Sequence, residues 1–97
     1  MLDKIKQLME VKKQAEGLKR ELDGTTIEVN DVRGIKITVN GSQRFQSIEV
    51  DTEMLGADNK KRLEGDLLRS INNAVGKSQA LAAQKMKDLT GLNIPGL

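Results

Sequence analysis

The chain has 97 residues, a length typical of one domain, with no cysteine, no histidine and a formal net charge of +2. The two missing residue types exclude disulfide bonds, thiolate or imidazole metal sites, cysteine nucleophiles and histidine general bases. No stretch approaches the roughly 20 apolar residues of a membrane span, and the amino-terminal segment lacks the apolar run of a secretory signal. We therefore expect a cytoplasmic protein that uses no metal, cofactor or membrane.

The modest net charge hides a strong segregation along the chain. Residues 1–22 carry an excess of two positive charges, residues 23–57 an excess of three negative charges, and residues 58–90 an excess of three positive charges. Two basic segments separated by an acidic one favour a polyanion as partner. Only 37% of the residues are hydrophobic and Phe45 is the sole aromatic residue, so a monomer has little material for a core. We expect oligomerisation, most simply as a two-fold dimer.

Residues 2–22 are predicted to form an amphipathic helix. Apolar residues recur there at spacings of three and four, as on one face of a helix: Leu8, Val11, Ala15, Leu18 and Leu22. Lys6, Lys13 and Arg20 repeat every seven residues on the opposite face. Gly24 is expected to end the helix, because glycine readily adopts the left-handed conformation at a helix C-terminus.

Residues 25–51 change to a period of two, which is typical of β-strands. β-branched residues alternate in three runs, predicted to be strands of one antiparallel sheet: Thr25, Ile27 and Val29, then Ile35, Ile37 and Val39, then Ile48 and Val50. Asp31–Gly34 is predicted to form the first turn, and Asn40-Gly41 the second, as a two-residue hairpin loop.

The two-residue loop would pair Val39 with Ser42 in the second hairpin. Under this register Ile48 shares the face of Ile37, whereas Phe45 falls on the opposite face unless a β-bulge shifts it. The sheet is therefore expected to have one apolar face and one mixed face.

The last long element is predicted as a helix from Asp58, a suitable N-cap, to about Thr90. Its apolar residues form two adjacent rows: Leu67, Ile71, Ala74, Ser78 and Leu81, and Leu68, Val75, Ala82 and Leu89. Gly91 is expected to end the helix, and residues 92–97 to form an irregular tail. The prediction is a single α+β domain over residues 1–91, ordered α-β-β-β-α, with a three-stranded antiparallel sheet flanked by two long helices.

Several short segments occur in a specific order and spacing across nearly the whole chain. They are Gly34–Gly41, Ile48–Asp51, Met54-Leu55, Leu63–Leu68, Asn73-Ala74, Met86, Thr90-Gly91 and Pro95-Gly96. With them the chain resembles the YbaB/EbfC family of bacterial nucleoid-associated proteins, best over residues 34–75. The resemblance implies a tweezer-like homodimer, whose helical arms protrude from a β-sheet base and bind DNA. It also implies a place in the nucleoid and a role in chromosome organisation or gene regulation.

Basic residues on the two helices are the candidate DNA contacts. If the helices run antiparallel, Met1 and the region after about Val75 lie together at a far tip. That tip collects Lys4, Lys6, Lys77, Lys85 and Lys87 against Asp3 and Asp88. Lys4 and Lys85 interrupt apolar rows, which is costly for a buried unpaired lysine and favours a seam that opens to water there. With the basic faces of both helices, the candidates are Lys4, Lys6, Lys12, Lys13, Lys19, Arg20, Arg69, Lys77, Lys85 and Lys87.

Binding through these residues would be dominated by phosphate contacts, with double-stranded DNA bound at low sequence specificity. Lysine outnumbers arginine in the chain, and lysine acts on phosphate as a point charge more than as a reader of bases. Because Phe45 is expected in the sheet, a platform for stacking single-stranded bases is not expected. We assign the dimer interface to sheet residues, namely Ile35, Ile37, Val39, Phe45, Ile48 and Val50.

Mixed charge is also the norm for solvated faces, and Glu10, Glu16 and Glu21 lie among the lysines of the first helix. Two other functions therefore stay open: a protein-interaction module whose helical seams bind a partner protein, and a peripheral membrane binder. The membrane binder is less favoured because the first helix lacks Phe and Trp. Asp51 and Glu53 lie without a partner base, a metal ligand set or a Gly-rich loop, so no enzyme activity is expected.

Overall fold

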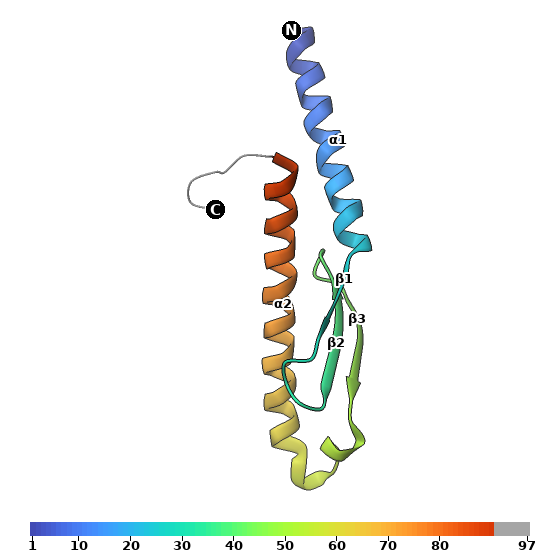
Figure 1. The fold of residues 1–97 in the computed structure, drawn as a ribbon, viewed down its shortest axis with the longest axis vertical. Coiled ribbons are helices and arrows are strands. Elements are labelled where there is room, and N and C mark those ends of the chain that lie inside the picture. Colours follow the sequence, from blue (N-terminus) through green and yellow to red (C-terminus); the bar gives the residue numbers. More distant parts are fainter. Residues whose placement is uncertain (91–97) are drawn as a thin grey trace.

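The computed structural model describes residues 1–90 and has the predicted α-β-β-β-α order of elements (Figure 1). The two helices are α1, Leu2–Gly24, and α2, Lys60–Thr90. Between them lie the strands β1 Thr26–Val29, β2 Ile35–Asn40 and β3 Phe45–Val50, and the 3-10 turns η1 Thr52–Met54 and η2 Ala57–Asn59. The predicted helix stop at Gly91 and the tail over residues 92–97 lie outside the described residues.

The end of α1 is formed by a threonine cap. The backbone N–H of Thr25 donates to the carbonyl of Leu22 at 3.3 Å, and its hydroxyl donates to the carbonyl of Glu21 at 2.7 Å. These bonds satisfy carbonyls that the last turn of a helix leaves without partners. Gly24 is the last residue of α1, as predicted. Its φ is not positive, however, so the expected left-handed glycine cap is absent there.

The three strands form one antiparallel sheet in the order β1-β2-β3, with apolar residues on one face, as predicted. The other face is polar. There Lys36, on the central strand, lies 3.3 Å from Glu28 on β1 and 3.7 Å from Glu49 on β3. A hydrogen bond to Glu28 and the charges of both carboxylates raise the pKa of Lys36. This face therefore carries paired charges with an acidic excess.

The loop of the second hairpin has three residues, Gly41–Gln43, instead of the predicted two. The side-chain oxygen of Asn40 causes the longer loop, because it accepts the backbone N–H of Ser42 at 3.0 Å and that of Arg44 at 2.9 Å. Gln43 then takes a positive φ of 63°, a conformation typical of the last residue in three-residue hairpin loops.

The longer loop changes the pairing of β2 with β3. The predicted pairing of Val39 with Ser42 is wrong, since Val39 lies opposite Phe45. A β-bulge leaves Gln46 without a partner on β2 and restores the alternation, so that Ile48 faces the same side as the apolar residues of β2. Phe45 therefore lies on the apolar face of the sheet, opposite Val39. The sequence predicted this position for Phe45 only in the presence of a β-bulge.

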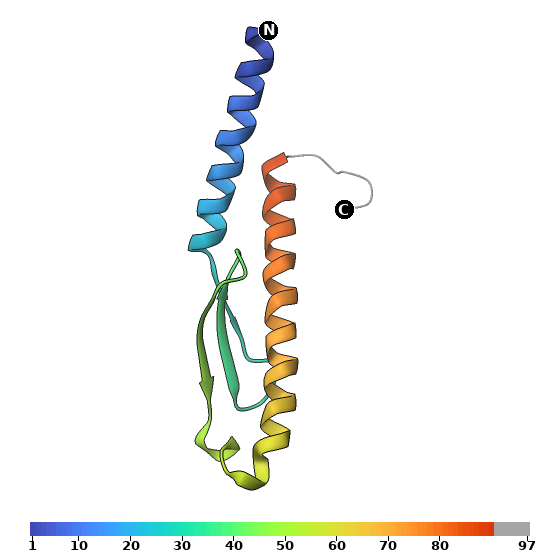
Figure 2. The same cartoon turned by 180° about the vertical axis from the view of Figure 1, so that it is seen from behind.

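α2 lies along the apolar face of the sheet, over β1 and β2 (Figure 2). The first predicted apolar row of α2 faces the sheet, with Ala74 and Ser78 fully buried and Leu67 and Ile71 packed at the edge of the core. The small side chains in this row let the helix approach the strands closely. The buried hydrophobic core is Val29, Val32, Ile35, Ile37, Val39 and Ala74.

The connection from the sheet into α2 differs in detail from the prediction. α2 begins at Lys60, and Asp58 lies in η2, where no side-chain capping bond occurs. Asn59 holds this segment instead, because its side-chain amide donates to the carbonyl of Leu55 at 3.2 Å. The first turn ends at Gly34 as predicted, with a φ of +87°, and a Cβ there would collide with the sulfur of Met54.

The molecule is long and thin. Its radius of gyration is 18.6 Å, against about 13 Å for a compact domain of this size, and it extends over 67 × 26 × 16 Å. Both views show the cause: α1 continues away from the sheet and passes beyond the C-terminal end of α2 (Figures 1 and 2). One helix therefore packs on the sheet and the other projects from it.

Candidate nucleic-acid interface

The first 16 residues of the chain form a projecting arm, and every one of them is exposed. At 1.5 Å per residue the arm is about 24 Å long. Even Leu8 and Val11, which belong to the predicted apolar seam, are 70% and 62% exposed. Only from Gly17 and Leu18 onward is α1 partly covered by other elements. The arm therefore presents all of its sides to a partner.

The root of the arm, at the end of α1, is fixed by the second hairpin. The backbone N–H of Gly41 donates to the carbonyl of Leu22 at 3.0 Å, and the side-chain amide of Asn40 donates to the carbonyl of Asp23 at 3.2 Å. The hydroxyl of Ser42 donates a short hydrogen bond to the Asp23 carboxylate. Gly41 is required by close approach, because a Cβ there would lie 2.8 Å from Cδ2 of Leu22.

Six positive residues lie on α1, and within residues 1–90 none of them forms an ion pair: Lys4, Lys6, Lys12, Lys13, Lys19 and Arg20. At about 100° per residue, Lys6, Lys13 and Arg20 fall on one narrow stripe. Lys12 and Lys19 follow a second stripe, between the first stripe and the apolar seam. These five residues form the cationic side of α1.

The carboxylates of α1 lie mostly beside its cationic side and not within it. By the same helical geometry, Asp3, Glu10 and Glu21 lie on the far side of the Lys6 stripe. Glu16 is the exception, since it lies between the two stripes of positive residues. A polyanion that approaches the cationic side therefore meets concentrated positive charge, and no ion pair has to be broken first.

Lys77 and Lys85 do not lie at a shared tip with Lys4. Lys77 Nζ lies 2.9 Å from the carboxylate of Asp31, in the loop between β1 and β2, and Lys85 Nζ lies 2.8 Å from that of Glu21. The predicted tip is wrong because α2 runs beside the sheet and reaches only the root of α1. Two of the predicted DNA contacts thus lie in ion pairs with carboxylates of other elements.

Lys85 interrupts its apolar row because Glu21 accompanies it, and not because the seam opens to water. The hydrogen bond that Glu21 accepts from the Lys85 ammonium raises the pKa of Lys85. The side chain of Lys85 is 30% exposed, and its partner's is 54% exposed. This pair links the root of α1 to the last turns of α2.

The remaining charges of α2 are also largely balanced. Lys60 lies 3.0 Å from Glu64, and Arg69 lies 2.7 Å from Asp66, each within the helix. Lys87, another predicted contact, lies in the last turn of α2. Within residues 1–90, the positive side chains of α1 therefore form no ion pair, whereas most of those of α2 do.

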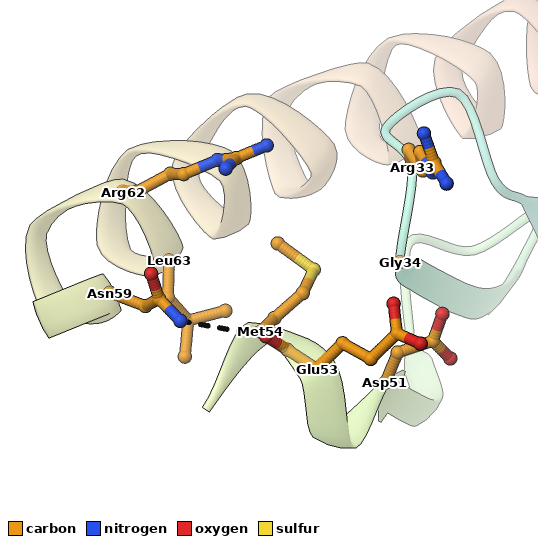
Figure 3. Close-up of a pocket in the computed structure, with 8 residues that line it drawn as sticks. All are labelled: Arg33, Gly34, Asp51, Glu53, Met54, Asn59, Arg62 and Leu63. Atoms are coloured by element: carbon orange, nitrogen blue, oxygen red, sulfur yellow. Dashed lines mark hydrogen bonds between the residues drawn. The ribbon is translucent and has the colours of Figure 1, made fainter. Parts of the chain in front are cut away.

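A pocket of about 180 Å³ lies at the end of the molecule opposite the arm (Figure 3). Two arginines, Arg33 and Arg62, border it, and so do the carboxylates of Asp51 and Glu53. Figure 3 shows the Asp51 and Glu53 side chains on the side of Arg33, with Met54 at the centre of the pocket. Because the two charges of each sign balance, this pocket does not present a net positive field to a polyanion.

The residues assigned to a dimer interface divide into two groups. Ile35, Ile37 and Val39 are at most 3% exposed and lie beneath α2 within one chain, so they offer no surface to a second chain. Phe45 and Ile48, on β3, are 41% and 48% exposed, because α2 covers β1 and β2 but leaves β3 largely open. Val50, at the end of β3, is half-buried.

The second apolar row of α2 also stays uncovered in part. Leu68 is 62% exposed and Leu89 is 47% exposed. Lys77 marks the side of α2 that faces the loop between β1 and β2, and the row of Leu68 lies roughly opposite to it around the helix. This row therefore points away from the loop between β1 and β2, and part of it stays exposed.

Two residues of interest were missed by sequence reasoning, Arg44 and Leu68. A two-residue loop that pairs Val39 with Ser42 would place Arg44 opposite Ile37, in mid-strand, whereas in the structure Arg44 stands at the root of the arm. An available signal was Asn40 itself, since asparagine side chains hydrogen-bond the backbone two residues on and so favour longer turns. Leu68 was assigned to an apolar row, but periodicity does not show which of two rows a sheet will cover.

The structure thus combines an α-β-β-β-α fold, one helix packed on the sheet and one projecting helix with a cationic side, an arrangement that suits an extended polyanion. The sequence matches the YbaB/EbfC DNA-binding family over residues 1–93. The chain belongs to this family, which is a family of DNA-binding proteins and not of enzymes.

Curated relatives span almost the whole chain. A nucleoid-associated protein of Thermoanaerobacter pseudethanolicus is 32% identical over 95 residues, which cover 96% of this chain and 86% of the relative. One of Pelotomaculum thermopropionicum is 34% identical over 95 residues, covering 96% of this chain and 90% of the relative. A nucleoid-associated protein of Prochlorococcus marinus is 32% identical over 100 residues, which cover 99% of this chain and 85% of the relative.

Membrane spans and groups of metal ligands are both absent from residues 1–90. None of the helices described there is both long and apolar enough to cross a membrane. The same part of the chain brings no three acidic, cysteine or histidine side chains together in a group that could hold a metal ion.

Proposed function

We propose that this protein binds double-stranded DNA through the cationic side of α1, as a homodimer with low sequence specificity. The proposal includes a role in chromosome organisation or gene regulation, since its relatives are named nucleoid-associated proteins. The observation that carries it is the set of six α1 cations on a helix that projects from the fold, none of which forms an ion pair with another described residue. Membership of a DNA-binding family supports the same conclusion.

Low sequence specificity follows from the kind of side chains on α1. Five of its six cations are lysines, which act on phosphate as flexible point charges and lack the rigid planar fork of arginine. No aromatic side chain lies on this helix. Phosphate contacts carry no sequence information directly, so affinity should depend on salt far more than on sequence.

The homodimer is supported by the open apolar surface on the β3 side, defined by Phe45, Ile48 and Leu68. These side chains are between 41% and 62% exposed although they adjoin the core. Contiguous apolar surface on a small protein is typical of an interaction site. A second copy with the same surface would cover it under two-fold symmetry and would present two arms to one duplex.

Gel retardation with two unrelated duplexes at several salt concentrations tests DNA binding. If a dimer neutralises about six phosphates, log K should fall with log salt at a slope of about −5, equally for both duplexes. The triple variant Lys6→Gln, Lys13→Gln and Arg20→Gln should lower the affinity at least about 100-fold at 0.1 M salt, because each phosphate contact is worth nearly tenfold there.

The matched control removes three positive charges from the far end of α2, as Lys60→Gln, Lys61→Gln and Arg62→Gln. It has the same net charge as the α1 variant, and we expect an affinity within about threefold of the unaltered protein, since distant charges are screened. Equal losses in both triple variants would show that net charge, and not the α1 surface, governs binding.

Sedimentation equilibrium tests the homodimer. Leu68→Asp should convert the dimer into monomers, because it places a charge in the apolar surface that the second copy covers. Met9→Asp, on the arm, is the control: Met9 is 66% exposed, close to the value for Leu68, and its change should leave the mass unaltered. A monomeric unaltered protein would contradict the dimer.

The exposed apolar seam of the arm supports a second candidate function. Leu8 and Val11 are free to pack against a helix of a partner protein, as in other helix-in-groove interactions. The gel-retardation experiment separates the two functions. If neither duplex is retarded even at low salt, the arm serves a protein partner and the lysines only keep it soluble.

A further inference from the structure

A groove of about 620 Å³ lies at the root of the arm, between the end of α1 and the hairpin of β2 and β3. It is lined by Lys19 and Asp23 from α1 and by Asn40, Ser42, Arg44, Phe45 and Gln46 from the hairpin. The two cations are 25 positions apart in the sequence and come from different elements. Only the tertiary fold brings them to the same groove.

The charge of the groove is positive, and its cations are available. Within residues 1–90, neither Lys19 nor Arg44 forms an ion pair. Asp23 is the one carboxylate among the lining residues, and it already accepts a hydrogen bond from the hydroxyl of Ser42. An anion in the groove would therefore meet two cations against one carboxylate, a net positive charge.

The hairpin that carries Arg44 is fixed before any ligand arrives. The buried hydroxyl of Ser78, on α2, donates to the carbonyl of Asn40 at 2.7 Å and accepts the backbone N–H of Gln43 at 3.1 Å. The backbone N–H of Arg44 donates to the side-chain oxygen of Asn40 at 2.9 Å, and the carbonyl of Arg44 accepts the backbone N–H of Asn40 at 3.0 Å. Ordering this loop on binding costs little, because the loop is already held by α2 and by its own turn.

The groove also continues the cationic side of α1. Lys12 and Lys19 are seven residues apart on one stripe, which places them about 10 Å from each other along the helix. Arg44 extends that line from the helix to the sheet. A guanidinium suits this end of the line, since its planar fork binds phosphate oxygens in pairs.

We infer that Lys19 and Arg44 together bind one backbone phosphate of duplex DNA. The DNA would then contact both the hairpin of β2 and β3 and the cationic side of α1. This inference rests on the proposed DNA binding and deepens it by adding a contact outside the helices. It predicts that DNA lies against the root of α1 and not only along its tip.

The test is gel retardation of one duplex by Arg44→Gln and by the control Arg33→Gln. Both variants lose one arginine of a β-turn region, but Arg33 lies at the opposite end of the molecule. Arg44→Gln should lower affinity about fivefold or more at 0.1 M salt and reduce the salt slope by about one per subunit. Arg33→Gln should stay within about twofold. Circular dichroism verifies that both variants keep their helix content.

The double variant Lys19→Gln, Arg44→Gln decides whether the two side chains share one phosphate. The loss should be clearly smaller than the product of the two single losses, because removing either partner already weakens the same contact. Losses that multiply would overturn the shared site, and an Arg44→Gln affinity equal to that of Arg33→Gln would overturn the role of the hairpin. If the unaltered protein retards no duplex, the proposed function fails as well.

Discussion

The two long helices have similar composition but opposite surroundings. α1 and α2 are both basic and amphipathic, yet residues 1–16 of α1 are exposed on every side, whereas α2 buries Ala74 and Ser78 against the sheet. Within residues 1–90 the cations of α1 form no ion pair, while Lys77 and Lys85 of α2 lie close to carboxylates. The same residue types are therefore left available on the surface of one helix and paired within the fold in the other.

The difference arises from how much of each helix meets the sheet. α2 runs back along the apolar faces of β1 and β2, so its charged residues come next to acidic loops and to the end of α1. α1 joins the sheet only at its last turns, through Leu22 and Asp23. A helix that overlaps the core by about one turn gains little from packing, and the rest of it stays in solvent.

The largest expected difference between the two helices is in hydrogen exchange. Amides of residues 5–14 should exchange through openings of less than about 1 kcal/mol, since an isolated helix of this length is marginal in water. Amides of residues 70–78 should need several kcal/mol, close to global unfolding. Hydrogen-exchange mass spectrometry of the DNA-free protein measures both. Strong protection of residues 5–14 would show that the arm is packed in solution.

Substitution at Gly41 should weaken the root of the arm. In Gly41→Ala the new Cβ would lie 2.8 Å from Cδ2 of Leu22 and 3.1 Å from its carbonyl oxygen, so the hairpin and α1 must move apart. We expect a loss of about 2–3 kcal/mol in the free energy of unfolding, measured in urea. The control Gly17→Ala meets nothing within 4 Å and should gain about 0.5–1 kcal/mol through helix propensity.

Two buried serines of α2 offer a matched pair of variants. Ser78→Ala removes a hydroxyl that bonds Asn40 and Gln43, and should cost about 1–2 kcal/mol of stability. The hydroxyl of Ser70 is equally buried but has no hydrogen-bond partner among residues 1–90, so Ser70→Ala should be neutral or stabilising. Thermal unfolding of both proteins compares them directly. Equal losses would mean that packing, and not the hydrogen bonds, decides the effect.

The Lys85–Glu21 pair should have the smallest effect, because both side chains are partly exposed. Lys85→Glu should lower the urea midpoint slightly, by less than Ser78→Ala does. Adding Glu21→Lys to it reverses the pair, preserves the net charge and should restore the midpoint. If the double variant is no more stable than the single one, the pair does not hold α1 to α2.

The same pair predicts a pH dependence. Because Glu21 raises the pKa of Lys85 in the folded protein, the pair stabilises the fold fully below the ordinary value of 10.5. That contribution is lost as the pH rises through the raised pKa. The difference in unfolding midpoint between the unaltered protein and Lys85→Gln should therefore shrink in strongly alkaline buffer, above the raised pKa.

Much of the fold could be read from periodicity. The change from helical spacing to alternation places every helix and strand within a few residues, and the turn at Gly34 is where composition predicts it. The second hairpin could not be read in this way. Asn40-Gly41 favours a two-residue loop by local preference, but the side chain of Asn40 and the close approach of Leu22 to Gly41 select a longer one.

The candidate site was predictable only in part. Regular spacing assigns Lys6, Lys13 and Arg20 to one face of α1 from the sequence alone. The position of Lys85 relative to Lys4 depends on how far α2 reaches along α1, and that depends on where the sheet lies between them. Arg44 became a candidate only through its place beside the end of α1.

The sequence by itself determined the order of helices and strands, the apolar face of the sheet and the cationic stripe of α1, because these follow from periodicity within each segment. The tertiary structure alone decided which basic residues keep their charge available. Pairing depends on distances between residues far apart in the chain, such as the 2.8 Å between Lys85 and Glu21, and these distances are set by how α2 packs on the sheet.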